Sequence, residues 1–241
     1  MTLVNKVAIV TGSSRGIGRA IAERLGRDGA SVVVNYAGNA DKAQEVVQAI
    51  ESSGGKAIAV QADISDLGQV RQLFDAAEAH FGNLHILINN AGTFLMKPVI
   101  DTTLEELDKV ITLNVRGIFL ALQEAARRIG DGGRIVNLSS NATIRSDPNT
   151  SIYAASKAAV EQLTRVLAKE LGARQITVNA VAPGATETDM VPDMAREMAP
   201  QITPLGRLGQ PTDIADVVAF VVSEEARWIT GQIIGVNGGM S

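Results

Sequence analysis

Short β-branched runs alternate along the chain with longer segments in which apolar residues recur at helical spacing. Seven runs are predicted to be strands, and several are apolar almost throughout, as expected where helices cover both faces of a parallel sheet. The predicted strands are Val7–Val10, Ser31–Asn35, Lys56–Gln61, Ile86–Asn89, Arg134–Leu138, Ile176–Ala180 and Ile233–Val236. The predicted helices are Arg15–Arg27, Ala40–Ser52, Gly68–Phe81, Thr103–Ile129, Ser151–Leu171 and Pro211–Ser223.

This repeated alternation predicts an α/β fold, a single doubly wound Rossmann-type domain over residues 1–241 with a seven-stranded parallel sheet and helices on both faces. In such a fold the ligand crevice lies beyond the carboxyl ends of the strands, so the turns that leave the strands are the places to search. One irregular, proline-containing stretch, residues 183–210, is predicted to be a lid over a substrate pocket.

Composition narrows the class of protein. With 46% hydrophobic and 20% charged residues, the 241-residue chain has enough apolar side chains for one globular core. A net charge of −4 gives no electrostatic reason to bind nucleic acid or an anionic membrane, and the absence of cysteine excludes disulfides, thiolate metal sites and a thiol nucleophile. With no signal-like leader, membrane-length apolar run or metal motif, we expect a cytoplasmic protein without a metal, nucleic-acid or membrane partner.

The first predicted strand is followed by a glycine-rich turn, Thr11–Gly18, with the spacing G-x-x-x-G-x-G. Glycine lets the backbone turn tightly and approach a pyrophosphate, and the positive end of the helix that follows favours an anion. A turn that binds nothing is the alternative, but the position after the first strand is the one that a dinucleotide fingerprint requires. The predicted contacts are Gly12, Ser13, Ser14, Arg15, Gly16, Ile17 and Gly18.

The end of the second strand bears on the choice of dinucleotide. A site for the unphosphorylated ribose usually places a carboxylate there, whereas this chain has Asn35, Tyr36 and Ala37. Arg15 could pair with a 2′-phosphate, although it could equally be a solvated surface charge. The pattern favours NADPH, with NADH as a weaker alternative.

Two further strand ends are predicted to contact the dinucleotide. Asp63 and Ile64 follow the third strand, where a carboxylate could accept a hydrogen bond from the adenine amino group; Asp63 could instead be a turn or cap residue ahead of Asp66. Small residues after the fourth strand permit close approach of the backbone to the cofactor. These residues are Asn90, Ala91 and Gly92.

A tyrosine and a lysine four positions apart, Tyr153 and Lys157, share one face of a predicted helix. An ammonium about 4 Å from a phenol is worth about 4 kcal/mol at an effective dielectric constant near 20, so the phenol pKa is expected to fall towards neutrality, where a general acid is useful. Ser140 ends the fifth strand and Asn114 lies in the long helix before it; either could serve this site, or be an ordinary cap or a satisfied core amide.

These motifs together resemble the short-chain dehydrogenase/reductase family over essentially the whole chain, and within it most closely the 3-oxoacyl-[acyl-carrier-protein] reductases and related carbonyl reductases. The resemblance implies that Tyr153 donates a proton to the substrate carbonyl, that Ser140 rather than Ser139 polarises that oxygen, and that Lys157 lowers the phenol pKa and binds the nicotinamide ribose. The matching positions are Thr11, Gly12, Gly16, Gly18, Asp63, Asn89, Asn90, Ala91, Gly92, Asn114, Ser140, Tyr153, Lys157, Pro183 and Gly184.

The resemblance also implies that Asn114 holds a water that relays protons to Lys157, that Pro183, Gly184 and Thr188 lie beside the nicotinamide, and that the protein is a homotetramer. The expected activity is NADPH-dependent, reversible reduction of a ketone or 3-oxoacyl carbonyl. Reduction of other small ketones or sugars is the alternative, as is a non-catalytic dinucleotide sensor that keeps the fold without the chemistry.

The expected partners are a small substrate and, for a 3-oxoacyl group, an acidic acyl carrier protein. Arg174, Arg127 and Arg128 could contact that carrier, or be solvated helix-end charges. Thioethers and apolar residues could line a pocket for an apolar ketone or acyl chain, or be core packing. The candidates are Met190, Met194 and Met198; Phe94, Leu95 and Met96; and Asn141, Ala142, Thr143 and Ile144. A small-residue surface that would let another helix approach comprises Ala154, Ala155, Ala158 and Ala159.

Overall fold

The computed structural model describes residues 2–189, 191 and 193–240 and contains one seven-stranded sheet. The strand order is β3-β2-β1-β4-β5-β6-β7, and every neighbouring pair is parallel. The predicted fold class is therefore confirmed. The strands are β1 (Val7–Val10), β2 (Ser31–Tyr36), β3 (Lys56–Gln61), β4 (Ile86–Asn89), β5 (Arg134–Leu138), β6 (Thr177–Pro183) and β7 (Ile233–Val236).

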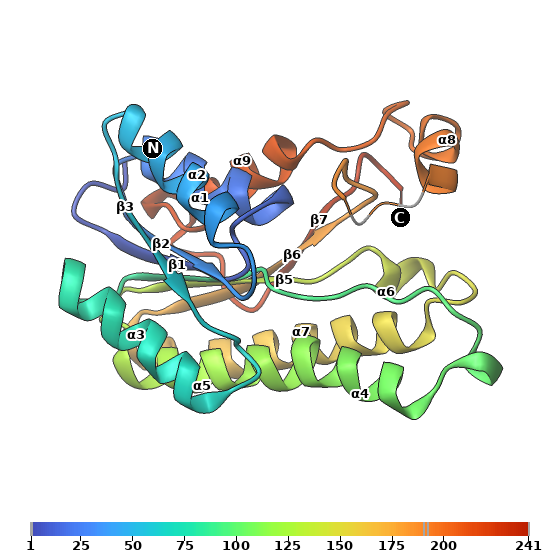
Figure 1. The fold of residues 1–241 in the computed structure, drawn as a ribbon, viewed down its shortest axis with the longest axis horizontal. Helices are drawn as coiled ribbons and strands as arrows, with labels where there is room; N and C mark the ends of the chain where they lie inside the picture. Colours follow the sequence, from blue (N-terminus) through green and yellow to red (C-terminus); the bar gives the residue numbers. More distant parts are fainter. Residues whose placement is uncertain (1, 190, 192, 241) are drawn as a thin grey trace.

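Helices cover both faces of the sheet (Figure 1). One layer contains α1 (Gly16–Arg27), α2 (Ala40–Ser52) and α9 (Pro211–Val221), and the other contains α3 (Leu67–Phe81), α4 (Leu104–Ile111), α5 (Ile118–Arg128) and α7 (Ser151–Glu170). Two further helices, α6 (Ala142–Arg145) and α8 (Asp193–Ile202), lie beyond the end of the sheet. In the part of the chain that the structure describes, no helix combines the length and the apolar character that crossing a bilayer requires.

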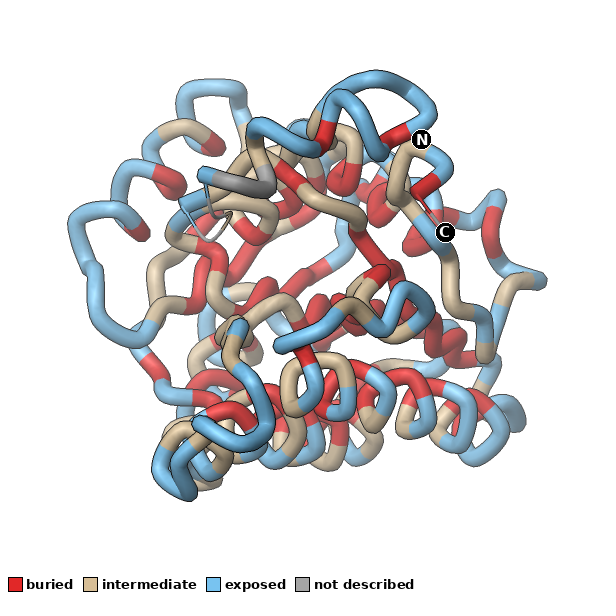
Figure 2. The backbone as a smooth tube through the Cα atoms, turned by 90° about the vertical axis from the view of Figure 1, so that its right-hand side faces the viewer, coloured by how far each residue is buried: buried red, intermediate tan, exposed pale blue. Residues whose placement is uncertain are grey.

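The core is divided by the sheet into two apolar clusters. Ala8 and Val10 of β1 pack with residues of α1, α2 and α9, while Val7 and Ile9 pack with residues of α3, α5 and α7. Successive residues of a strand point to opposite faces, so an almost wholly apolar strand fills both clusters. Figure 2 shows the buried backbone concentrated in the strands and on the inner sides of the helices.

The predicted helix Thr103–Ile129 is three segments in the structure. Between α4 and α5 lies a π-helical turn, η2 (Thr112–Gly117). A π-helical turn adds a residue to the turn and rotates the side chains that follow, and such turns often occur at functional sites. The turn places Asn114 in the interior, fully buried, beneath the carboxyl end of β4.

The strand order places the ligand crevice. The chain moves outward from β1 through β2 to β3, then returns to the other side of β1 for β4, so β1 and β4 are the neighbours at which the order reverses. The helices that follow these two strands leave towards opposite faces, which opens a crevice at their carboxyl ends.

Candidate active site

A cavity of about 840 Å³ lies at the carboxyl ends of the strands. Its volume is in the range of cofactor and small-molecule sites. Most of the residues that the sequence singled out are on its wall: Gly12, Ser14, Arg15, Gly16, Ile17, Gly18, Asn35, Tyr36, Ala37, Asp63, Ile64, Asn90, Ala91, Gly92, Ser140, Tyr153, Lys157, Pro183, Gly184 and Thr188. Ser13 and Asn114 are not among the lining residues, and both are fully buried.

The glycine-rich turn has the conformation that only glycine adopts without strain. Gly12 has a φ of 60°, and a Cβ added there would lie 2.9 Å from the Ala91 Cα. Gly16, at the start of α1, has a φ of 57°, and its Cβ would lie 3.3 Å from Thr188 Cγ2. The first turn of α1 carries no acidic residue and its N-cap makes no side-chain hydrogen bond, so this helix end is suited to a phosphate anion.

Two of the predicted cofactor contacts, Ser13 and Asn35, hold the glycine-rich turn in place through hydrogen bonds. The Ser13 hydroxyl donates to the Val10 carbonyl oxygen at 2.7 Å, which directs the side chain into the core. Asn35 Oδ1 accepts from the Gly12 N–H at 3.1 Å, and its Nδ2 donates to the Ala62 carbonyl oxygen at 3.0 Å. Asn35 thereby ties the β1–α1 turn to the ends of β2 and β3.

Asn90 joins the same turn to β4. Its Nδ2 donates to the carbonyl oxygens of Thr11 and Gly12 at 2.9 and 3.0 Å. In return, Thr11 Oγ1 accepts from the backbone N–H groups of Asn90 and Ala91, both at 3.0 Å. These bonds fix the two turns against each other across the point where the strand order reverses.

Asp63 lies on the cavity wall in a local turn. Its Oδ1 accepts from the backbone N–H of Ser65 at 2.9 Å and from the Ser65 hydroxyl at 2.7 Å. The turn alternative considered from the sequence is therefore present, while Asp66 caps α3 by accepting from Gln69 N. A contact between Asp63 and adenine stays a prediction.

The chemical groups meet at the other end of the cavity. Tyr153 and Lys157 project from successive turns of α7, with the lysine Nζ 5.9 Å from the centroid of the tyrosine ring. The Tyr153 hydroxyl is hydrogen-bonded to the Ser140 side chain, and the Phe94 ring packs edge-on against the phenol at a centroid distance of 4.8 Å. The neighbouring Ser139 hydroxyl instead donates to Glu161, which does not line the cavity, at 2.8 Å.

Comparison with known proteins identifies the family. A family model described as enoyl-(acyl carrier protein) reductase matches residues 12–241. The chain belongs to the short-chain dehydrogenase/reductase family.

Individual members are similar over almost their entire length. Versicolorin reductase stcU from Emericella nidulans is 46% identical, with 98% of this chain and 96% of that protein covered. A short-chain dehydrogenase from Burkholderia cenocepacia, solved in complex with NADP, superposes with a TM-score of 0.96 at 45% identity, covering 100% of this chain and 99% of that one. The angucycline C-6 ketoreductase LanV, solved with bound NADP, gives a TM-score of 0.94 at 42% identity, covering 99% and 96%.

In this short-chain dehydrogenase/reductase, Asn114 lies behind the Gly92 turn, close to Lys157. Its Oδ1 accepts from the Thr93 N–H at 2.8 Å, and its Nδ2 donates to the Thr93 carbonyl oxygen at 2.9 Å and to Ser156 Oγ at 3.0 Å. A Cβ on Gly92 would lie 3.1 Å from Asn114 Oδ1 and 3.5 Å from Lys157 Nζ. Both amide hydrogens of Asn114 are therefore used within the protein, and the predicted relay water stays a prediction.

The expected lowering of the Tyr153 pKa is wrong for this chain. Burial raises the pKa of the phenol above its ordinary value, opposed by the hydrogen bond with Ser140. Burial also lowers the pKa of Lys157 to about 8. The sequence argument weighed only the attraction between the ammonium and a phenolate, whereas in the interior the desolvation of both groups is the larger effect.

The substrate end of the cavity is lined in part by the predicted residues. Phe94, Met96, Asn141, Ala142 and Met198 are on its wall, whereas Leu95, Thr143 and Ile144 are not. Met190 lies outside the described residues, as does the side chain of Met194.

Other lining residues were missed by the sequence argument. Met240, near the C-terminus, reaches the cavity because β7 lies beside β6, and its carbonyl oxygen accepts from Asn141 Nδ2 at 3.0 Å. Leu113 and Ile202 complete the apolar wall. At the dinucleotide end the missed residues are Gly38, Asn39 and Lys42. An Asn ahead of a predicted helix is a capping signal, and it could have placed Lys42 in the first helical turn, facing the phosphate end.

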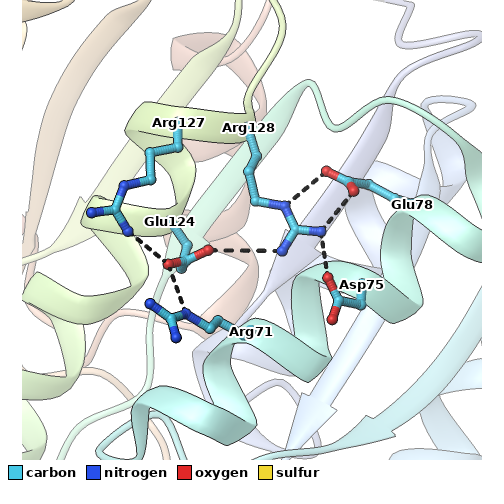
Figure 3. Close-up of polar contacts among 6 residues, drawn as sticks. All are labelled: Arg71, Asp75, Glu78, Glu124, Arg127 and Arg128. Atoms are coloured by element: carbon cyan, nitrogen blue, oxygen red, sulfur yellow. Dashed lines mark hydrogen bonds and ion pairs between the residues drawn. The ribbon is translucent and has the colours of Figure 1, made fainter.

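The arginines expected to contact a carrier protein are elsewhere. Arg128 donates to both carboxylate oxygens of Glu78, at 3.0 and 2.6 Å, and to Asp75 at 2.7 Å, while Arg127 pairs with the buried Glu124 at 3.1 Å (Figure 3). Arg71 also donates to Glu124. The cluster joins α3 to α5, and its network holds the pKa of Arg128 above the ordinary value.

Arg174 is similarly engaged. It donates to Asp131, in the turn before β5, at 2.8 Å and to the carbonyl oxygen of Ala126, in α5, at 2.7 Å. That edge of the sheet is opposite the cavity. All three arginines have partners within the protein, and a contact with a carrier protein stays a prediction. Among the described residues there is also no group of three or more potential metal ligands.

The burial of Lys157 generates a stability prediction. Lowering the pKa from 10.5 to about 8 means that holding the ammonium in the folded state costs about 3 kcal/mol below pH 8. Between pH 8 and 10.5 Lys157 is largely deprotonated in the folded protein but still protonated in the unfolded chain, so the cost decreases as the pH rises. We expect Lys157→Met to be more stable than the wild type at pH 7 by about 1–2 kcal/mol, allowing for the lost hydrogen bond to Leu138.

Urea unfolding at pH 7 and pH 10 measures this difference. The advantage of the methionine variant should shrink at the higher pH, because there the wild type no longer carries a buried charge. A variant that is less stable at pH 7, or an advantage that does not change with pH, would contradict the assignment.

Proposed function

We propose that this chain is an NADPH-dependent reductase that transfers a hydride to a ketone or 3-oxoacyl carbonyl, reversibly, with Tyr153 as general acid. One observation carries the proposal. The phenol, hydrogen-bonded to Ser140 and one helical turn from the buried Lys157, shares a single cavity with the glycine-rich turn. A dinucleotide bound along that cavity would place its nicotinamide ring beside a carbonyl that contacts the phenol.

The residues at the dinucleotide end fit NADPH. The glycine cradle leaves room for a pyrophosphate that a Cβ would fill, and β2 ends without the carboxylate that a free 2′-hydroxyl prefers. Arg15 and Lys42 are both on the wall and bring positive charge to the place of a 2′-phosphate. Arg15 is paired there with Asp189 at 3.3 Å, but both side chains are largely exposed, so the pair is weak and a doubly charged phosphate would compete for the guanidinium. The Burkholderia cenocepacia protein and LanV, both solved with NADP, support this choice. When bound, the cofactor supplies the hydride.

The side chains of the protein supply the proton that the substrate oxygen receives. The Ser140 hydroxyl polarises the carbonyl oxygen, and Tyr153 donates its proton to the same oxygen as negative charge develops there. A buried phenol with a raised pKa remains protonated at neutral pH, so it is ready to act as a donor in the direction of reduction. Lys157 would bind the nicotinamide ribose and return a proton to Tyr153, with Asn114 holding the water behind it. Pro183, Gly184 and Thr188 would position the nicotinamide end.

The cavity favours an apolar ketone over a sugar. Its substrate end is lined by aliphatic, thioether and aromatic side chains, including Phe94, Met198 and Met240. Versicolorin reductase and the ketoreductase LanV, by their names, are reductases as well, which supports a ketone substrate.

The charges near the mouth give little support to an acidic carrier protein as partner. Arg145 pairs with Asp147 at 2.8 Å and Arg196 with Glu187 at 2.9 Å. A cation already paired with a carboxylate attracts a second acidic partner weakly. We therefore favour a small free ketone over a carrier-bound 3-oxoacyl group, and keep the cytoplasm as the proposed location.

The first prediction concerns the proton donor. Tyr153→Phe should lower kcat for NADPH oxidation with an activated ketone by about 10²–10⁴-fold, because only the hydroxyl is removed. Fluorescence titration with NADPH is the control and should give an unchanged affinity. Unchanged turnover in the variant would eliminate the mechanism. If the wild type and the variant both bind NADPH but neither converts any ketone, sugar or enoyl thioester, the result would favour the dinucleotide sensor.

The second prediction concerns the choice of cofactor. Arg15→Ala should weaken NADPH binding by about 10–100-fold, through loss of a charge-assisted hydrogen bond, and leave NADH binding nearly unchanged. Arg19→Ala is the matched control, since Arg19 lies one turn along α1 and is paired with Glu23 at 2.7 Å. Higher catalytic efficiency with NADH than with NADPH in the wild type would refute the assignment.

The third prediction concerns assembly. We propose a homotetramer, and large apolar side chains are exposed where copies could meet: Phe119 of α5 is 48% exposed and Trp228, near β7, is 95% exposed. Light scattering at micromolar concentration should give about four times the 25.3 kDa mass of the chain. A monomer at that concentration would contradict the proposal.

A further inference from the structure

A buried carboxylate, Glu161, lies behind Ser140 and takes no part in the mechanism above. It is on α7, one helical turn beyond Lys157, and is 8% exposed. It is not among the residues that line the cavity. A carboxylate in the interior is costly unless its oxygens are hydrogen-bonded, so its partners indicate what it does.

Both close partners of Glu161 flank Ser140 in the sequence. Glu161 Oε1 accepts from Ser139 Oγ and from Thr143 Oγ1, each at 2.8 Å. The other oxygen, Oε2, is 3.6 Å from a guanidinium nitrogen of Arg165, whose side chain is largely exposed. The carboxylate is thus a single acceptor shared by two hydroxyl groups.

The opposite side of the same segment is held by β6. The Ser139 N–H donates to the Val181 carbonyl oxygen at 2.8 Å, and the Asn141 N–H donates to the Pro183 carbonyl oxygen at 2.9 Å. These bonds fix the backbone on either side of Ser140 but do not reach α6. Side chains supply the remaining attachments: Asn141 Nδ2 donates to the Met240 carbonyl oxygen at 3.0 Å, and Glu161 accepts from Ser139 and Thr143 on the α7 side.

The attachment to Glu161 matters because the chain after Ser140 has little stability of its own. It enters α6, a helix of 4 residues that ends at Ser146 in a left-handed conformation with a φ of 52°. A single helical turn is unstable in isolation and depends on its tertiary contacts. Thr143 lies in this turn, so its bond to Glu161 ties α6 to α7 next to the Ser140 hydroxyl.

We infer that Glu161 is a positioning residue for the carbonyl reduction: by holding the hydroxyl groups of Ser139 and Thr143, its carboxylate aims the Ser140 hydroxyl at Tyr153 and the substrate oxygen. The inference rests on the proposed function for its kinetic consequence. Its structural content, the orientation of Ser140, is independent of turnover. A charged acceptor suits this task because charge-assisted hydrogen bonds are about twice as strong as neutral ones.

The kinetic test compares two substitutions at one site. Glu161→Leu removes the acceptor and should lower kcat by about 10–100-fold, the range expected when a polarising group is displaced by a fraction of an ångström. Glu161→Gln keeps an acceptor oxygen and should recover most of kcat. KM and NADPH affinity should stay within about twofold in both. Arg165→Met, which removes only the exposed ion-pair partner, is the control and should match the wild type.

The second test reads the Tyr153 hydroxyl directly. The chain has two tyrosines, so a Tyr36→Phe background leaves Tyr153 as the only phenol whose ionisation changes the near-ultraviolet absorbance. Because the Ser140 hydrogen bond lowers the pKa of Tyr153, a loosened Ser140 should raise that pKa in Glu161→Leu and leave it unchanged in Glu161→Gln. If Glu161 acted only as a nearby negative charge, both substitutions would lower the pKa.

Equal losses of kcat in the Leu and Gln variants, a change in KM alone, or a lowered phenol pKa would each overturn the inference. If Glu161→Leu does not fold, Ser139→Ala removes one of the two bonds and should give a smaller kcat loss and a smaller pKa rise. Should the wild type reduce no ketone, the phenol titration still decides whether Glu161 positions Ser140, so the two proposals can fail separately.

Discussion

The hydrogen bond from the buried Lys157 ammonium to the Leu138 carbonyl oxygen, 2.8 Å long, joins helix α7 to the sheet. Lys157 is only 5% exposed, so its charge must find a partner inside the protein. The partner it finds is the last residue of β5, two positions before Ser140. This contact holds α7 against the end of β5 that leads to Ser140, and the distances among Ser140, Tyr153 and Lys157 depend on it.

The polar side chains at the strand ends hold the turns around the cavity in place through hydrogen bonds. Asn35, Asn90 and Thr11 exchange hydrogen bonds with one another's turns, which holds the glycine-rich loop in place. The sequence assigned the two asparagines to cofactor contact because they lie at the crevice. Side chains that hold a binding loop in this way are expected at the same positions as those that touch the ligand, since both must come from the carboxyl ends of the strands.

The fold was predictable from sequence because parallel strands covered on both faces are apolar almost throughout. Five predicted strands agree with the structure at both ends, namely β1, β3, β4, β5 and β7. In β3 a charged first residue and a polar last residue bracket an apolar centre. The π-helical turn before α5 was not predictable, since one added residue leaves the apolar pattern on either side intact. Met240 was missed because its place on the cavity wall depends on the pairing of β6 with β7. The phenol pKa was misjudged because sequence spacing reports a charge pair but not its desolvation.

Helix α7 carries the chemistry at successive turns, with Tyr153, Lys157 and Glu161 each four residues apart. Residues at this spacing lie on one face, so a single rigid element sets the phenol, its cationic neighbour and the carboxylate behind Ser140. The same helix is anchored to β5 by Thr164, whose hydroxyl accepts from Asn137 Nδ2 at 2.9 Å. Two charged groups buried along one helix, Lys157 and Glu161, cost stability, and the apolar clusters on both faces of the sheet offset that cost. A site built in this way is stiff, because moving any one of the three groups requires moving the helix, and with it the contacts to β5.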